Sequence, residues 1–126
     1  MDDIKSFIED LGIAAFEANI KIAGLAVVSN SGELIHHTEN WDISNQTDAL
    51  LNLLKGEKSI IIQGQNFIVV KANNDGIIAT SESGMGHVIL APFQKGILIS
   101  YAMQQADPNK ALDFLNHYVL GLNEKI

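Results

Sequence analysis

The chain has 126 residues, of which 47% are hydrophobic and 18% charged, enough for one domain with an ordinary core. It contains no cysteine, which excludes disulfides, cysteine zinc ligands and a thiol nucleophile. The net charge of −7 lies entirely within residues 1–50, because residues 51–126 hold six acidic residues and six lysines. With no arginine to clamp phosphates, this distribution disfavours nucleic acid and anionic membranes as partners.

Residues 2–22 predict an amphipathic helix, because apolar side chains recur at helical spacing from Ile4 to Ile22. Asp2 and Asp3 suit its N-terminus, where the helix dipole favours negative charge. We expect the helix to end at Gly24, and Gly12 marks where a kink would form. The acidic start lacks the basic region of a signal peptide, and no apolar run approaches the ~20 residues that span a bilayer, which indicates a cytoplasmic protein.

Residues 24–39 predict a strand, an Asn-Ser-Gly turn and a second strand. A second helix is expected to start near Ser44 or Thr47, either of which can cap it, and to end at Gly56. Between the two, Trp41 is expected to anchor the loop to the core.

Residues 58–126 predict a series of hairpins closed by a helix that starts at Asp107-Pro108. The expected strand segments are 60–62, 67–70, 76–78, 88–90 and 97–99. Links of two to five residues are too short for a crossover, so neighbouring strands must run antiparallel. The fold class is therefore α+β: one domain over 1–126, with a central antiparallel sheet of about seven strands flanked by N-terminal, middle and C-terminal helices.

Candidate catalytic and metal-binding groups are few. His36 and His37 are adjacent and would point to opposite sides of a strand, while His87 and His117 are isolated in sequence. The glycine-rich stretch 83–86 lacks the Lys-Ser/Thr and the helix of a phosphate-binding loop. We expect no metal, no cofactor and no enzymatic activity.

The closing helix has two stripes at helical spacing. The core stripe comprises Ala111, Phe114, Leu115, Tyr118, Val119 and Leu122. The second comprises Asn109, Leu112, Asp113, Asn116, His117 and Leu120. Two interpretations have equal weight: a protein-binding surface of mixed character, or leucines covered by neighbouring side chains.

Over residues 62–101 and the closing helix, the order of glycine turns and strands, ending at Tyr101, resembles the profilins, small proteins that bind actin monomers. The resemblance extends more weakly over the helix–hairpin–helix start, and the missing arginine and acidic N-terminal half suggest a divergent, archaeal-type member. It implies a monomeric, cytoskeleton-associated protein that regulates actin polymerisation by covering one end of the actin subunit. The implied actin-binding residues are Lys71, Ala79, Ser81, Met85, His87, Asn109, Leu112, Asp113, Asn116 and His117.

The resemblance also implies a groove for proline-rich peptides at Ile4, Phe7 and Ile35. Such grooves use stacked aromatic rings, and only Phe7 supplies one here, which disfavours this ligand. The charge of the chain likewise disfavours phosphoinositides.

Two alternatives remain at this stage. A roadblock or longin-type platform for small GTPases would form a stable dimer, but roadblock domains typically have three strands after the second helix, whereas this chain predicts five. A small-molecule sensor would have a pocket under the sheet and would be stabilised by its ligand.

Overall fold

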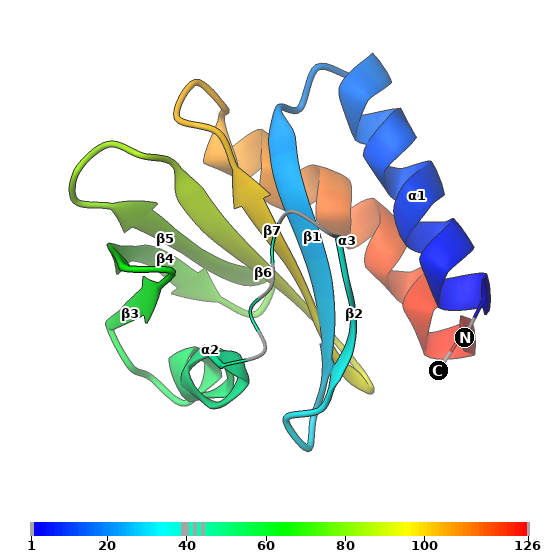
Figure 1. Ribbon diagram of the computed structural model, residues 1–126, viewed down its shortest axis with the longest axis horizontal. Helices are drawn as coiled ribbons and strands as arrows, with labels where there is room; N and C mark the ends of the chain where they lie inside the picture. The colour runs from blue at the N-terminus through cyan, green and yellow to red at the C-terminus, as the bar shows by residue number, and fades with distance from the viewer. Residues whose placement is uncertain (1, 39–40, 42, 44, 126) are drawn as a thin grey trace.

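The computed structural model describes residues 2–38, 41, 43 and 45–125 as a seven-stranded antiparallel sheet with helices on both sides (Figure 1). The helices are α1 (Asp2–Glu17), α2 (Thr47–Leu54) and α3 (Pro108–Lys125). The strands are β1 (Ile22–Ser29), β2 (Leu34–His37), β3 (Ser59–Ile62), β4 (Gln65–Asn73), β5 (Gly76–Ser81), β6 (His87–Phe93) and β7 (Gly96–Ala102). Their order in the sheet is β2-β1-β7-β6-β5-β4-β3, which confirms the predicted fold class and the five-strand meander.

Helix α1 is shorter than predicted and does not break at Gly12. It ends at Glu17 because Asn19 adopts a left-handed conformation with φ of 58°. The Ile20 amide donates to the Ala15 carbonyl and the Asn19 amide to the Phe16 carbonyl, the pattern of a Schellman cap. Asparagine tolerates this conformation better than most residues, so it ends the helix five residues before Gly24, which lies within β1.

Strand β1 lies inside the sheet, between β2 and β7, with Val27 opposite Leu98. Trp41 packs over this strand as predicted, and only 4% of its surface is exposed. A Cβ on Gly24 would come within 2.9 Å of the Trp41 side chain, so a glycine is needed at this approach.

Helix α2 begins at Thr47, one of the two predicted starts, but Gln46 takes the N-cap position and makes no side-chain capping bond. Ser44, the other predicted cap, lies outside the described residues. Gly56 follows the helix with φ of 109°, as expected for the residue after a C-cap. Asp107 caps α3: its Oδ1 accepts hydrogen bonds from the amides of Asn109 at 3.0 Å and Lys110 at 3.3 Å.

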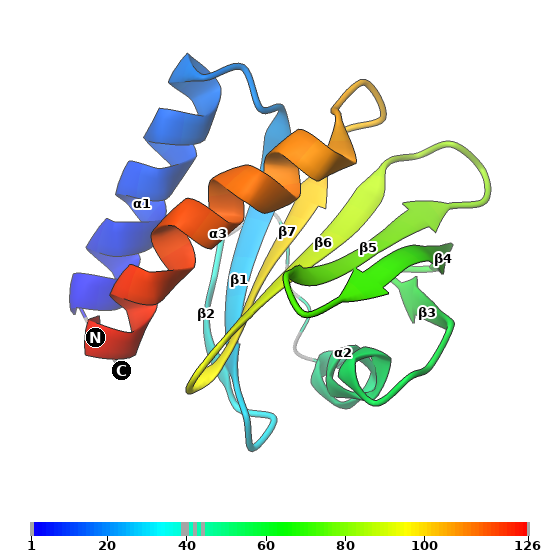
Figure 2. The same cartoon turned by 180° about the vertical axis from the view of Figure 1, so that it is seen from behind.

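The sheet has an apolar core on each side. Helices α1 and α3 lie together on one side and α2 lies on the other (Figure 2). Strand side chains alternate between the two cores: Ile78 packs towards α1 and α3, whereas its neighbours Ile77 and Ala79 pack on the α2 side. This alternation decides which strand residues can reach a surface beside α3.

Candidate functional site

Helix α3 lies across β5, β6 and β7. Its position on the sheet shows that Leu112, a member of the predicted second stripe, is not a surface residue. Leu112 is buried, with 1% of its surface exposed, and belongs to the core beneath α3. Its Cδ1 lies only 2.7 Å from where a Cβ on Gly76 would stand, so the glycine at the start of β5 makes room for it. Leu120 is 71% exposed. The two leucines therefore differ: one is core and one is surface.

Two residues that the resemblance assigned to actin binding are also buried. Ala79 is fully buried on the α2 side of β5, and Ser81 is 5% exposed. The Ser81 hydroxyl lies within hydrogen-bonding distance (3.0 Å) of the Ser83 hydroxyl. Because alternate residues of a strand point to opposite sides, Ala79 and Ser81 share one side and are kept from the side that carries α3. Neither can contact a partner there.

The other helix residues of the predicted set reach solvent. Asn109, Asp113 and His117 are exposed and Asn116 is half-buried. The Lys71 ammonium donates to Asn109 Oδ1 at 3.1 Å, which links β4 to the start of α3. His117 Nδ1 lies 3.0 Å from the Asp113 carbonyl oxygen one turn earlier. The structure thus brings residues about 40 positions apart in sequence onto one surface.

Beside α3, the sheet adds a row that runs across three strands. The register aligns Ile68 of β4 with Thr80 of β5, and Thr80 with His87 of β6. Thr80 Oγ1 and His87 Nδ1 are hydrogen-bonded at 2.9 Å, and Ile68 is 39% exposed. Met85, in the turn before β6, is 51% exposed.

We call the combined region the α3/β4 surface. It comprises Ile68, Lys71, Thr80, His87, Asn109, Asp113, Asn116 and His117, and the resemblance adds Met85, which is exposed in the turn before β6. Ile68 and Thr80 were missed by the sequence analysis. The signal was present for Ile68: Ile68, Val69 and Val70 are consecutive, and alternation forces at least one of three apolar strand residues to point away from a given core.

The α3/β4 surface offers hydrogen-bonding and apolar contacts with little net charge, since Lys71 and Asp113 carry opposite charges. In the part of the chain that the structure describes, no three His, Cys, Asp or Glu side chains gather to hold a metal ion.

The residues predicted for proline-rich peptides do not form a groove. Ile4 is buried with 3% exposed, whereas Ile35 is half-buried against the same core and lies on β2. Phe7 instead meets the Tyr118 ring of α3, which in turn meets the Phe114 ring. The Phe7 ring centroid lies 6.3 Å from that of Tyr118, edge to face, and Tyr118 lies 4.9 Å from Phe114. Phe114 and Tyr118 pack against the core, as their stripe predicts, yet both rings and that of Phe7 are only half-buried.

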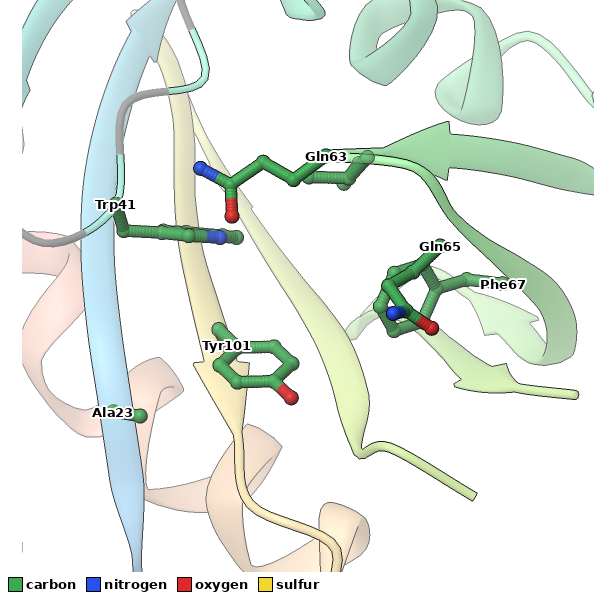
Figure 3. A pocket seen from close by; sticks show the side chains of 7 residues that line it. Ala23, Trp41, Gln63, Gln65, Phe67 and Tyr101 are labelled. Atoms are coloured by element: carbon green, nitrogen blue, oxygen red, sulfur yellow. The ribbon is translucent and has the colours of Figure 1, made fainter. Parts of the chain in front are cut away.

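A pocket lies on the α2 side of the sheet, between Trp41 and Tyr101 (Figure 3). Its volume is about 280 Å³, and Gln63, Gln65 and Phe67 complete much of the wall. The Trp41 and Tyr101 rings are 6.1 Å apart, while the Tyr101 hydroxyl donates to the Met85 carbonyl. This volume is just below the range of small-ligand sites, ~300–1,000 Å³, and Trp41 and Phe67 are already buried by packing. The pocket is therefore a weaker candidate than the α3/β4 surface.

Solved structures with the same architecture are profilins. A profilin from Schizosaccharomyces pombe superposes with a TM-score of 0.68 over 81% of this chain and 87% of its own, at 20% identity, which shows a shared fold. Loki profilin-1, in its complex with rabbit actin, superposes with a TM-score of 0.88 over 100% of this chain and 98% of its own, at 31% identity.

The sequence then places the chain within that class. Loki profilin-1 from Lokiarchaeum sp. is 33% identical over 114 residues, covering 82% of this chain and 85% of the relative. Odin profilin from Odinarchaeota yellowstonii is 36% identical over 92 residues, covering 71% and 76%. No family model matches the chain. The chain belongs to the profilin family, as the resemblance predicted. Among its described helices, none has the length and apolar character to cross a bilayer.

Proposed function

We propose that this profilin binds an actin monomer through the α3/β4 surface and regulates polymerisation by covering one end of the actin subunit. One observation carries the proposal: Loki profilin-1, which forms a complex with rabbit actin, matches this chain over its full length with a TM-score of 0.88. Loki profilin-2 in complex with rabbit actin also matches, with a TM-score of 0.87 at 28% identity.

The mechanism needs occlusion and no catalytic step. A specific interface of ~1,200–2,000 Å² in total would cover one end of the subunit and leave the other free to join a filament. Ile68 and Met85 would supply apolar contact, while Lys71, Asn109 and Asn116 would supply hydrogen bonds. Because the surface has little net charge, electrostatic steering would be weak, so association would be slow and nearly independent of salt. This function places the protein in the cytoplasm, associated with the cytoskeleton.

The test uses two matched double variants. Ile68→Asp/Lys71→Glu changes the α3/β4 surface, and Leu54→Asp/Lys55→Glu makes the same chemical change at the end of α2, across the sheet. The pairs match because Ile68 is 39% and Leu54 40% exposed, and both lysines are exposed. Each protein is titrated against monomeric actin by calorimetry and added in excess to a polymerisation assay.

We expect the first variant to lose ~tenfold or more in affinity, as loss of a central contact does. The second should bind as the unmodified protein does. Equal affinity for both variants would place the actin contact elsewhere. If the unmodified protein leaves nucleation and elongation unchanged at high excess, the proposed function itself is wrong.

The half-buried rings of Phe7, Tyr118 and Phe114 favour a second candidate, a proline-rich segment resting between α1 and α3. Phe114 and Tyr118 also line a hollow with Ile20, which gives the rings an open side. Titration with a proline decamer would test this, with Phe114→Leu as the variant expected to weaken binding. An unchanged heat signal at millimolar peptide would exclude it.

A further inference from the structure

The outer side of α1 carries two large apolar side chains that the fold leaves uncovered. Phe16 is 86% and Ile13 59% exposed, whereas Ile8 and Leu11 on the inner side are buried. Figures 1 and 2 show α1 at the edge of the molecule, with α3 and β1 on its inner side. Single exposed apolar residues are common, but an exposed phenylalanine one turn from an exposed isoleucine forms a small patch.

Gly12 lies beside this patch and is not explained by packing within the molecule. Glycine inside a helix costs ~1 kcal/mol relative to alanine. At Gly121 the cost has a reason, because a Cβ there would come within 2.9 Å of the Phe7 ring where α3 approaches α1. At Gly12 a Cβ would meet no atom within 4 Å. A helix glycine on an open side permits the close approach of a backbone from outside.

The charges around the patch identify what could approach. Three carboxylates, Glu9, Asp10 and Glu17, lie between positions 9 and 17 of the chain, and no lysine does. Glu9 and Glu17 line a shallow hollow together with Gly12, Ile13 and Phe16. The hollow is therefore apolar in the middle and acidic at both ends.

We propose that this hollow binds a basic amphipathic helix of another protein, with an apolar stripe on Ile13 and Phe16 and lysine or arginine residues over Glu9 and Glu17. Two helices pack with their axes ~8–10 Å apart, and the glycine allows the shorter distance. A second copy of this chain would bring the same carboxylates together, and an anionic membrane would be repelled. The proposal does not depend on actin binding, because the strand residues of the α3/β4 surface lie on β4, β5 and β6, and β7 separates these strands from β1 and β2.

The experiment uses two labelled synthetic helices of eighteen residues with the same leucine stripe, one flanked by lysines and the other by glutamates. We expect the full-length protein to bind the lysine helix in fluorescence anisotropy and not the glutamate helix. Phe16→Ser should reduce the affinity ~tenfold. Leu120→Ser, which alters a similarly exposed residue on α3, should leave the affinity unchanged.

Gly12→Ala separates binding from folding. It should raise the melting temperature, because alanine is the better helix residue and nothing obstructs its methyl group, yet it should weaken the lysine helix severalfold. The proposal is overturned if the two synthetic helices bind equally or if Phe16→Ser behaves like Leu120→Ser. It is also overturned if sedimentation shows a dimer that Phe16→Ser dissociates, since a second copy would then be the occupant.

Discussion

Helices α1 and α3 pack side by side on the same side of the sheet, yet their outward surfaces differ. Outside its core stripe, α3 presents mainly polar residues, and Leu120 is its large exposed apolar side chain among the described residues. The surface of α3 continues onto strands β4–β6. Helix α1 presents Ile13 and Phe16 between carboxylates. Two helices with similar inner stripes can therefore serve one core and still offer different chemistry to partners.

The largest expected effect is a loss of stability when a buried side chain of α3, rather than an exposed one of α1, is shortened. Leu112→Ala should destabilise the protein by ~2–5 kcal/mol, since it leaves a cavity beneath α3 beside Gly76. Ile13→Ala removes a similar volume from the outer side of α1 and should change the stability by less than ~0.5 kcal/mol. Urea denaturation of both variants measures the difference. Equal losses would mean that the outer side of α1 is packed rather than exposed.

The next effect is the salt dependence of binding, which should differ between the acidic outer side of α1 and the nearly neutral α3/β4 surface. Raising ionic strength from ~0.05 to ~0.5 M shortens the Debye length severalfold. Binding of the lysine-flanked helix to α1 should therefore weaken ~tenfold, whereas actin binding at the α3/β4 surface should change by less than ~threefold. Parallel titrations at the two ionic strengths check this. The reverse order would show that charge dominates at the α3/β4 surface.

A smaller effect concerns the core beneath both helices. Ser100 is fully buried in β7, and its hydroxyl is the one buried side-chain oxygen or nitrogen in the described residues that lacks a hydrogen-bond partner. Ser100→Ala should stabilise the protein by ~1 kcal/mol, because an unpaired buried hydroxyl costs desolvation without return. Thermal and urea denaturation report the change. A loss of stability would reveal a partner for the hydroxyl.

The smallest effect belongs to the groove between α1 and β2. Burial lowers the pKa of His36 below its ordinary value of 6.5, and His37 and Lys5 lower it further, while Glu9 opposes them. The unfolded chain then binds the proton more readily than the folded one. The stabilising contribution is therefore complete above pH 6.5 and is lost as pH falls towards the lowered pKa. Melting temperatures from pH 7.5 to 5 should fall less for His36→Asn, and identical curves would contradict the lowered pKa.

The sheet could be predicted from the sequence because its signals are local. The Gln63-Gly64 turn, for example, adopts positive φ at both positions, as a two-residue hairpin turn requires. In the sequence, the same dipeptide separates two apolar segments, so the turn can be recognised without the structure. The end of α1 was mispredicted because helical spacing is also a local signal, and here it extends past the true end of the helix. The apolar spacing continues through Ala18 and Ile22, whereas the left-handed conformation of Asn19 ends the helix through a cap that forms only in the folded chain.

The candidate site was less predictable because it depends on contacts distant in sequence. Helical spacing alone cannot tell whether Leu112 meets solvent or the sheet, and its burial depends on space left by Gly76, 36 positions earlier. The resemblance assigned Ala79 and Ser81 to actin binding. Strand alternation puts both residues on the same side of the sheet as the buried Ile77, which faces α2, so alternation argues against that assignment. The row from Ile68 to His87 exists only through the register of three strands.

The place of β1 has a consequence for how the protein forms. The strand that enters the sheet first along the chain pairs with the one that enters last, so residues 22–29 find their central partner at residues 96–102. Pairing at such separation requires a large loop to close, and its entropy is lost before any contact between the strands stabilises the chain, which makes folding slow. During synthesis, the β1–β2 hairpin therefore remains an incomplete edge until β7 has left the ribosome, and this interval is when the chain is most prone to pair with the wrong strand.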